Sequence, residues 1–258
     1  MIILNEKEYV DDILRGKKTE PANIYIFLNT YARYLYHEKD LRRTGIMKEL
    51  DYFMDETIPN YNPADWNNRF EAYAKRAGAY PLCNCGGVWI TKNEIRTIRD
   101  IHDKVLERLA FTLLCLAKYG NFKNSDNNSW VSYRNGEIFS MACINTTSVE
   151  KDIKIGRLND LGLIQYAKKV NNLNIRVTYA EEHGTKELFV SDFRKLGNEW
   201  RLYNGEDYIR CSTCGILVKK KKGTSKYCCA CRKKSDAEKN RLRVAKHRRK
   251  CNASEILS

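Results

Sequence analysis

Near its C-terminal end the chain contains the segment RCSTCGILVKKKKGTSKYCCAC, residues 210–231. It contains two C-x2-C pairs, which are formed by Cys211, Cys214, Cys228 and Cys231. Four thiolates in two such pairs are the closed tetrahedral ligand set of a structural zinc site, and the glycine after the second cysteine lets backbone N–H groups point at the sulfurs. We therefore predict a zinc ribbon over residues 210–232 that holds one structural Zn²⁺.

Other cysteines leave two questions open. Cys229 with Cys231 would form a C-x-C pair, so Cys229 is an alternative ligand to Cys228, although the spacing favours Cys228. Cys83 and Cys85 form another tight C-x-C pair with no second pair nearby in sequence, and they could be half of a second metal site. In a reducing compartment, clustered cysteines indicate metal binding more often than disulfides.

The net charge of +14 is concentrated at the C-terminal end of the chain. Residues 210–258 contain 16 Lys and Arg and three acidic residues, a net charge of +13. The remaining 209 residues contain 30 basic and 29 acidic residues, a net charge of +1. A cationic tail on a near-neutral body predicts a polyanionic partner, chiefly nucleic acid and less an anionic membrane surface.

Residues 233–258 are predicted to form a basic helical tail, with Ser235 as its N-cap and Glu238 completing a capping box. Few apolar residues are available for packing, so the tail is either a solubilising surface or a phosphate-binding element. Its place directly after a metal-held knuckle favours phosphate binding. The tail and ribbon residues predicted to contact nucleic acid are Lys219, Lys220, Lys221, Lys222, Arg232, Lys233, Lys234, Arg241, Arg243, Lys246, Arg248, Arg249 and Lys250.

The sequence contains no membrane or export signal. No apolar run approaches the roughly 18–20 residues that a membrane span needs. The N-terminal residues MIILNEKEYVDD are acidic where a signal peptide would be basic. We therefore expect a protein of the bacterial host cytoplasm without a membrane partner.

Residues 1–82 are predicted to form a helical bundle. Helical periodicity predicts helices over residues 6–14, from Pro21 onward, over 45–54, and from the Asn62-Pro63 pair onward. Aromatic residues recur along one face of the last helix, at Trp66, Phe70 and Tyr73. At this spacing a core stripe is the better interpretation than a base-stacking surface.

Residues 92–205 are predicted to contain a winged helix-turn-helix. A long apolar helix, or two joined ones, over residues 92–119 precedes a strand, two helices and a hairpin. These elements are expected at residues 130–133, 135–143, 148–162, 163–169 and 175–179, with Ser148 as the N-cap and Gly162 as the C-cap of the second helix. The segment LNDLGLI, residues 158–164, resembles the end of the recognition helix and the start of the wing in many winged-helix domains.

In a DNA complex, the exposed face of the helix over residues 148–159 would enter the major groove. The expected nucleic acid is double-stranded DNA, and the body residues predicted to contact it are Lys151, Lys154, Arg157, Lys168, Lys169 and Arg176. The alternative is ordinary surface charge, because Asp152 and Asp160 dilute the positive face and many winged helices bind only proteins.

The C-terminal pattern R-C-x2-C-G-x-L-x-K…K-Y-C-x2-C, followed by a basic helix, resembles a group of phage and mobile-element proteins of Gram-positive bacteria. These share a winged-helix region and a C-terminal CxxCG…KYCxxC zinc ribbon. The similarity extends to residues 109–114, 172–177 and 192–197. The resemblance implies a mobile-element origin and a DNA-linked cytoplasmic role, but no particular activity. Cys229 departs from the pattern.

No motif of the sequence predicts an enzyme. The chain lacks a phosphate-binding glycine loop, an H-E-x-x-H motif and a nucleophile elbow. Two functions are therefore considered. The first is a transcription or replication accessory that uses a winged helix and a zinc-stapled tail to bind nucleic acid. The second is an anti-defence protein, such as an anti-CRISPR, that binds and inhibits a host protein–nucleic-acid complex.

Overall fold

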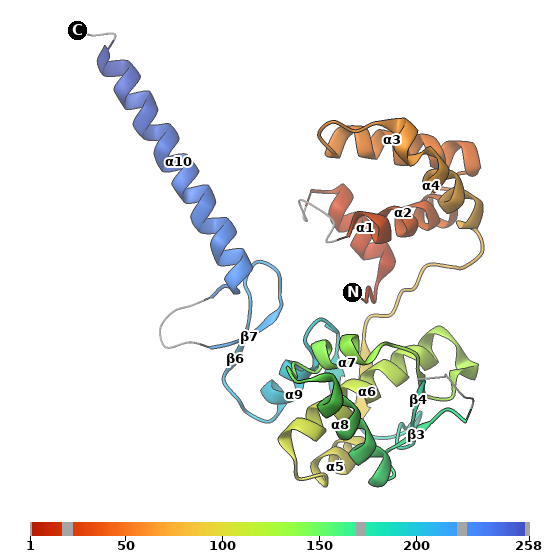
Figure 1. Cartoon of the computed structure of the whole chain (residues 1–258). Helices are drawn as coiled ribbons and strands as arrows, with labels where there is room; N and C mark the ends of the chain where they lie inside the picture. Colours follow the sequence, from red (N-terminus) through yellow and green to blue (C-terminus); the bar gives the residue numbers. More distant parts are fainter. Residues whose placement is uncertain (1, 17–22, 169–173, 221–225, 256–258) are drawn as a thin grey trace. The chain divides into compact units, whose positions relative to one another are not determined.

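The computed structural model describes residues 2–16, 23–168, 174–220 and 226–255, with the side chains of the last helix described up to residue 245. The chain is mainly helical with a few small antiparallel sheets (Figure 1), which confirms the predicted fold class at this level. It divides into two compact units, Met1–Val88 and Trp89–Ser258. Among the described residues, no helix is both long and apolar enough to cross a membrane.

The helices of the first unit are α1 (Glu6–Leu14), α2 (Ile24–Glu38), α3 (Arg43–Thr57) and α4 (Pro63–Arg76). Side chains of Asn5, Asn23 and Asn62 accept backbone N–H groups at the starts of α1, α2 and α4. Helix α1 has the predicted bounds, and α3 extends beyond the predicted residues 45–54 at both ends. The predicted start of α2 at Pro21 lies outside the described residues.

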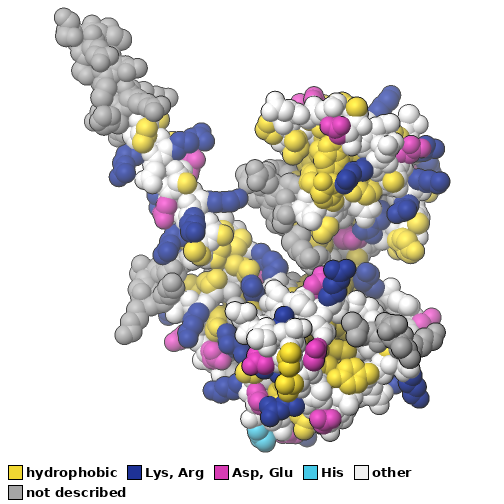
Figure 2. Space-filling model, viewed as in Figure 1, with side chains coloured by type: hydrophobic (Ala, Val, Ile, Leu, Met, Phe, Trp, Pro, Cys, Tyr) yellow, Lys and Arg dark blue, Asp and Glu magenta, His cyan; other side chains and the backbone are white. Residues whose placement is uncertain are grey.

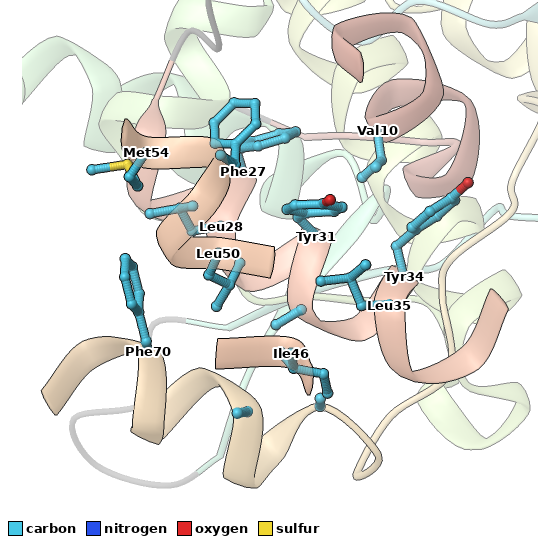
Figure 3. Close-up of a cluster of buried hydrophobic side chains, with 14 of the residues drawn as sticks. Val10, Phe27, Leu28, Tyr31, Tyr34, Leu35, Ile46, Leu50, Met54 and Phe70 are labelled. Carbon is cyan, nitrogen blue, oxygen red and sulfur yellow. The ribbon is translucent and has the colours of Figure 1, made fainter. Parts of the chain in front are cut away.

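The core of the first unit combines aliphatic and aromatic side chains (Figure 3). Phe27 of α2 packs against Phe53 of α3 with ring centroids 4.7 Å apart. Phe70 of α4 is fully buried in the same cluster, and Trp66 and Tyr73 pack against it half-buried. The aromatic stripe of α4 is therefore core, as predicted, because its helical spacing places these rings toward α2 and α3.

The remaining elements surround or follow α6 (Lys104–Lys123), a helix whose central residues are nearly all buried. They are β1 (Val88–Thr91), α5 (Lys92–Arg99), the 3-10 helix η1 (Ser125–Asn127), β2 (Trp130–Val131), α7 (Asn135–Met141), α8 (Ser148–Asp160), β3 (Ile164–Tyr166), β4 (Ile175–Val177), β5 (Lys186–Val190), α9 (Leu196–Tyr203), β6 (Tyr208–Arg210), β7 (Leu217–Lys219) and α10 (Cys229–Glu255). The apolar run over residues 92–119 is thus two helices, separated at Asp103, whose carboxylate caps α6.

Strand β4 lies between β2 and β3 in a three-stranded antiparallel sheet. Arg176 at its centre is opposite Trp130 on one side and Gln165 on the other. All three predicted strands are present but shorter than predicted, and α7 ends at Met141 rather than at residue 143. The turn expected between β3 and β4 falls largely outside the described residues.

Helix α8 begins one residue earlier than its predicted cap implies. The predicted N-cap Ser148 is wrong, because Thr147 holds that position: its hydroxyl accepts the Glu150 N–H, and the Glu150 carboxylate accepts the Thr147 N–H. At the other end, Gly162 has φ +73° and the Leu163 N–H donates to the Leu158 carbonyl, so Gly162 closes the helix as predicted.

A buried ion pair joins α5 to α6. The Glu94 carboxylate is fully buried, lies 2.8 Å from the Lys118 ammonium, and accepts the N–H groups of Thr91 and Glu181 at 2.7 Å each. The Lys118 ammonium also donates to the carbonyls of Trp89 and Glu181. Both charges are therefore surrounded by hydrogen-bond partners, as burial of an ion pair requires.

Helix α9 lies against the core of the second unit at close range. Trp200 packs on Phe111 of α6 with ring centroids 5.1 Å apart. Near the start of α9, a Cβ atom on Gly197 would lie 1.9 Å from the carbonyl oxygen of Ala142, so only glycine fits there. This close approach fixes the helix that supports the cysteine-containing segment described next.

Candidate metal centre and basic tail

The first C-x2-C pair sits at the turn of a short hairpin. Strands β6 and β7 pair antiparallel, with Arg210 opposite Leu217, and Cys211 follows directly after β6. The Cys211 N–H donates to the Ile216 carbonyl (3.0 Å), and the Gly215 N–H donates back to the Cys211 carbonyl (2.8 Å). Gly215 has φ +72°, a left-handed conformation that glycine adopts without steric cost. The turn of the hairpin thus places the sulfurs of the first pair on the same side, toward the second pair.

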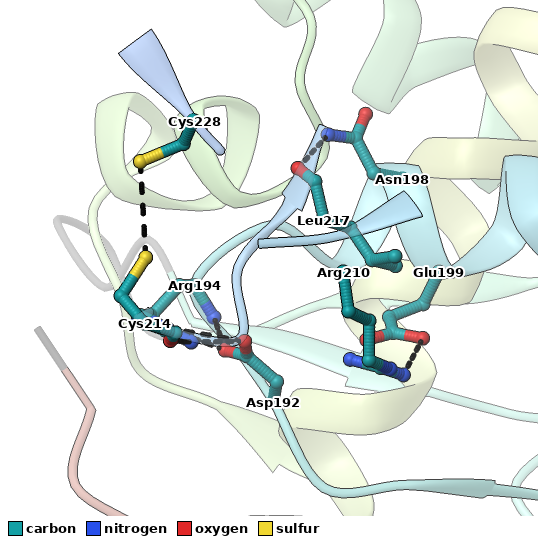
Figure 4. Close-up of polar contacts among 8 residues, drawn as sticks. All are labelled: Asp192, Arg194, Asn198, Glu199, Arg210, Cys214, Leu217 and Cys228. Carbon is teal, nitrogen blue, oxygen red and sulfur yellow. Dashed lines mark hydrogen bonds and ion pairs between the residues drawn. The ribbon is translucent and has the colours of Figure 1, made fainter. Parts of the chain in front are cut away.

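The second C-x2-C pair completes a four-cysteine cluster. The sulfurs of Cys211, Cys214, Cys228 and Cys231 all lie within 4.8 Å of one another and could hold a metal ion. The sulfurs of Cys214 and Cys228 are 3.8 Å apart (Figure 4). Cys228 is 9% exposed, whereas Cys229 is exposed and lies outside the cluster. The structure therefore places Cys228, not Cys229, at the fourth position.

The second pair also starts the long helix. The Cys231 N–H points at the Cys228 sulfur (3.4 Å), and the Arg232 N–H donates to the Cys228 carbonyl (2.9 Å). Helix α10 consequently begins at Cys229, inside the cluster. The predicted start at Ser235 is wrong, because the knuckle itself supplies the partners of the first backbone N–H groups and Ser235 lies within the helix.

The electrostatics of the cluster favour a cation. Burial opposes ionisation of Cys211, but backbone N–H groups of Cys228, Cys214 and Thr213 aimed at its sulfur lower its pKa to about 6. Burial and the neighbouring cysteines raise the pKa of Cys231 to about 12. One thiolate therefore forms readily, while further negative charge in the cluster requires a compensating positive charge, which a bound metal ion supplies.

Polar contacts attach the cluster to α9 and to the segment before it (Figure 4). Arg194 forms an ion pair with Asp192 and donates to the Cys214 carbonyl at 2.8 Å. The Asn198 amide donates to the carbonyl of Leu217 at 3.1 Å. Below the hairpin, Arg210 and the buried Glu199 lie 3.0 Å apart. The hairpin is thus docked on α9 rather than joined to the body by the chain alone.

The basic residues beside and after the cluster are exposed. This holds for all of the predicted nucleic-acid contacts there that the structure describes, namely Lys219, Lys220, Arg232, Lys233, Lys234, Arg241 and Arg243. Only Arg241 among them has an ion-pair partner in the described part of the chain, Glu238 at 3.9 Å. Figure 2 shows Lys and Arg side chains along the described part of α10. Outside the described residues lie Lys221 and Lys222 and the side chains of Lys246, Arg248, Arg249 and Lys250.

Three of the basic residues predicted to contact DNA on the body are already engaged. Lys151 lies over the Phe139 ring, 5.9 Å from its centroid. Arg157 faces Asp103 at 4.0 Å, and Arg176 donates to the carbonyl of Asn128 at 3.2 Å. These contacts hold the cations near the surface but reduce their freedom to meet a phosphate.

The remaining three body candidates differ in placement. Lys154 on α8 is half-buried, Lys168 after β3 is exposed, and Lys169 lies outside the described residues. The outward face of α8 instead exposes two apolar residues, Val149 at 69% and Ile153 at 55%. Val149 and Ile153 are four residues apart and therefore lie on one face of the helix, which differs from the face of the buried Ile155 and Leu158. This exposed apolar pair could have been recognised from the sequence.

Cys83 and Cys85 form backbone hydrogen bonds with the N-terminal residues of the first unit. The Cys83 carbonyl accepts the Glu6 N–H, and the Cys85 N–H donates to the Leu4 carbonyl. Cys85 is buried, and burial raises the pKa of its thiol. Within the described residues, the C-terminal cluster is the only group of three or more potential metal ligands.

No protein-family model, curated protein or solved structure matches the chain. What the protein does must therefore be inferred from the cysteine cluster, the charge of the tail and the surface of the body.

Proposed function

We propose that this chain is a nucleic-acid-binding protein of a phage or mobile element, acting as a transcription or replication accessory in the host cytoplasm. The observation that carries this proposal is the tail. Exposed cations, most of them without an ion-pair partner among the described residues, line a helix whose first turn belongs to a four-cysteine cluster. A surface of this kind releases counterions when it meets a phosphate backbone, which favours binding.

Zinc is the proposed metal. Ligands 2.3 Å from the centre of a regular tetrahedron, the usual Zn–S distance, lie about 3.8 Å apart. The Cys214 and Cys228 sulfurs are separated by 3.8 Å. Four thiolates leave no open coordination position, so the ion would be structural and would not bind substrate. Cys211, Cys214, Cys228 and Cys231 would hold it, and the backbone N–H groups aimed at Cys211 and Cys228 would support it.

The body is proposed to be a winged helix-turn-helix. Helices α6, α7 and α8 followed by the β3–β4 hairpin, with β2 completing the sheet, supply the element order and pairing of that fold. In this assignment α8 is the recognition helix. Its exposed Val149 and Ile153 would contact thymine methyl groups, and the exposed Lys168 would reach the backbone from the wing.

Fluorescence anisotropy with a mixed-sequence duplex at several salt concentrations tests the proposal. Contact with about six phosphates gives a slope of log K against log salt of about −5. Replacing four unpaired tail cations, Arg232, Lys233, Lys234 and Arg243, by Gln should reduce this slope to about −1.5, because each lost contact removes about 0.9. Measurable binding with no salt dependence, or none at all by the wild-type protein, would refute the proposal.

A matched control keeps the same change in net charge. Lys39, Lys48, Lys75 and Arg76 are exposed in the first unit, and none has an ion-pair partner in the described part of the chain. Changing these four to Gln should leave the salt slope within about 0.5 of wild type, since none would contact phosphate in the proposed complex. If both variants changed the salt slope equally, the effect of the tail would come from the net charge of the protein and not from specific phosphate contacts.

A second candidate is favoured by the face of α8. Val149 and Ile153 are exposed beside acidic Glu150 and Asp152, a combination that suits a protein surface better than a phosphate backbone. The protein would then be an anti-defence protein, such as an anti-CRISPR, with its tail on the nucleic acid of the host complex. Selection from random DNA separates the candidates. A sharp motif supports the regulator, whereas no motif together with a nuclease-resistant host complex lost on changing Val149 and Ile153 to Ser supports the inhibitor.

A further inference from the structure

Helix α5 carries three exposed cations on one face. Lys92, Arg96 and Arg99 are spaced by four and three residues, so their side chains emerge along the same side of the helix. Ile95 and Ile98 of the same helix are buried. The three cations belong to the part of the chain before residue 210, which is almost neutral overall. Their grouping is therefore not a consequence of the strongly basic tail.

The cationic face lines a shallow pocket of about 370 Å³, which α5 shares with residues of β5 and α9. Ile95 contributes an apolar part of the lining, and Tyr203 of α9 contributes an aromatic ring. Two acidic residues, Asp100 and Glu187, are also in the lining. The pocket therefore has three positive and two negative side chains around an aromatic ring, a mixed lining with a net positive charge.

Some of the charged side chains of the pocket have hydrogen-bond partners within the protein, and others have no ion-pair partner in the described part of the chain. The Tyr203 hydroxyl donates to the Glu187 carboxylate at 3.2 Å. Arg99 lies over the Tyr203 ring, 5.3 Å from its centroid, and donates to the Asn204 amide oxygen at 3.2 Å. Its guanidinium is thereby fixed in orientation while keeping donors for an external acceptor. In the described part of the chain neither Lys92 nor Arg96 has an ion-pair partner.

Helix α5 is followed by the short loop that contacts the proposed recognition helix. Arg99 ends α5, and four residues later Asp103 caps α6 and faces Arg157 of α8 at 4.0 Å. The loop between α5 and α6 therefore contacts the C-terminal half of α8. A nucleic acid that lies along α8 and passes this loop would meet the end of α5.

We propose that Lys92, Arg96 and Arg99 bind phosphates of the nucleic-acid backbone next to α8. The first and third positions are seven residues apart, or about 10.5 Å of helix, and one DNA strand advances about 3.4 Å of axis per phosphate, so the face covers about three phosphate steps. This inference rests on the proposed function and extends it. The tail supplies the larger part of the attraction, and α5 fixes how the body lies on the backbone.

The salt dependence of binding to a mixed-sequence duplex tests the site in the full-length protein. Changing Lys92, Arg96 and Arg99 to Gln should reduce the magnitude of the slope by about 2 to 3, since each phosphate contact contributes about 0.9. The matched control changes Lys48, Lys75 and Arg76 to Gln. Because Arg99 also packs on Tyr203, the double change of Lys92 and Arg96 to Gln, with an expected reduction of about 2, keeps the test valid if the triple variant unfolds.

Lysine acetylation gives an independent readout. The duplex should protect Lys92 at least fivefold from acetylation in the wild-type protein, while Lys48 remains as reactive as in the free protein. Equal slopes for the double variant and the control, or equal reactivity of Lys92 with and without duplex, would overturn the inference. If the wild-type protein itself fails to bind the duplex, the proposed function fails. If it binds through the tail alone, only the α5 site fails.

Discussion

Replacing Cys228 by Ser, and in a separate protein Cys229 by Ser, distinguishes a metal ligand from its neighbour one residue away. The two changes are chemically identical and remove one thiol each. Cys228 lies in the four-sulfur cluster and Cys229 is exposed outside it. We expect Cys228→Ser to release the metal and Cys229→Ser to retain it.

The size of the effect follows from the number of ligands. Structural zinc in small domains is bound with about 10–16 kcal/mol at pH 7, so an even share among four thiolates is about 3 kcal/mol, or more than a 100-fold loss of affinity. The segment has little else to hold it. Leu217 is its one large buried aliphatic side chain among the described residues 211–228, worth about 2 kcal/mol. Ordering each residue costs about 1–2 kcal/mol.

Zinc competition with a chromophoric chelator measures the affinity, and hydrogen–deuterium exchange measures the order of residues 207–231. Cys228→Ser should lose protection there and keep it in α6, whose partners are unchanged. Cys229→Ser should differ from wild type by less than about twofold in affinity. Equal zinc loss in both variants would contradict the assignment of Cys228 as the ligand, and a protected hairpin in the zinc-free protein would show that the metal does not order it.

Two further changes test the body by chemical denaturation. Glu94→Gln should lower the free energy of unfolding of the second unit by about 3 kcal/mol, because Lys118 then remains buried without its counter-charge. A loss below about 1 kcal/mol would mean that the carbonyl partners of Lys118 suffice. Gly197→Ala should cost about 3 kcal/mol or prevent folding, since its Cβ would overlap the carbonyl of Ala142. Gly156→Ala on α8, with nothing within 4 Å, should instead be neutral or stabilise by up to about 1 kcal/mol; similar losses for both would exclude the close approach as the cause.

Elements with local signals could be predicted from the sequence. The Asn62-Pro63 start of α4, the glycine that closes α8 and the C-x2-C pairs each depend on residues a few positions apart. The clustering of the four cysteines was predictable for the same reason, since two C-x2-C pairs are the usual ligand set of one structural metal ion. The start of α10 was misassigned because a serine three residues before a glutamate is a good cap in isolation, and the competing partner was a cysteine sulfur.

Elements that depend on distant partners were missed. Strand β1 pairs with β5, almost a hundred residues later, and the four or five residues of each have no strong alternation. Helix α9 is short and exists through Trp200 packing on Phe111 and through Gly197. The engagement of Arg157 and Lys151 was equally unpredictable, because the residues that hold them become neighbours only in the folded chain.

Because α10 starts inside the cysteine cluster, binding of a metal ion and formation of this helix would be thermodynamically coupled. A free helix must close its first turn before it gains regular hydrogen bonds, at a statistical cost of about a thousandfold, after which each residue adds at little cost. Here Cys228 already closes that turn, so a metal ion that fixes Cys228 would act as the nucleus of a helix that buries almost nothing. Metal occupancy and tail helicity are then reciprocal. A partner that binds the helical form must tighten metal binding by the factor by which the metal tightens the partner.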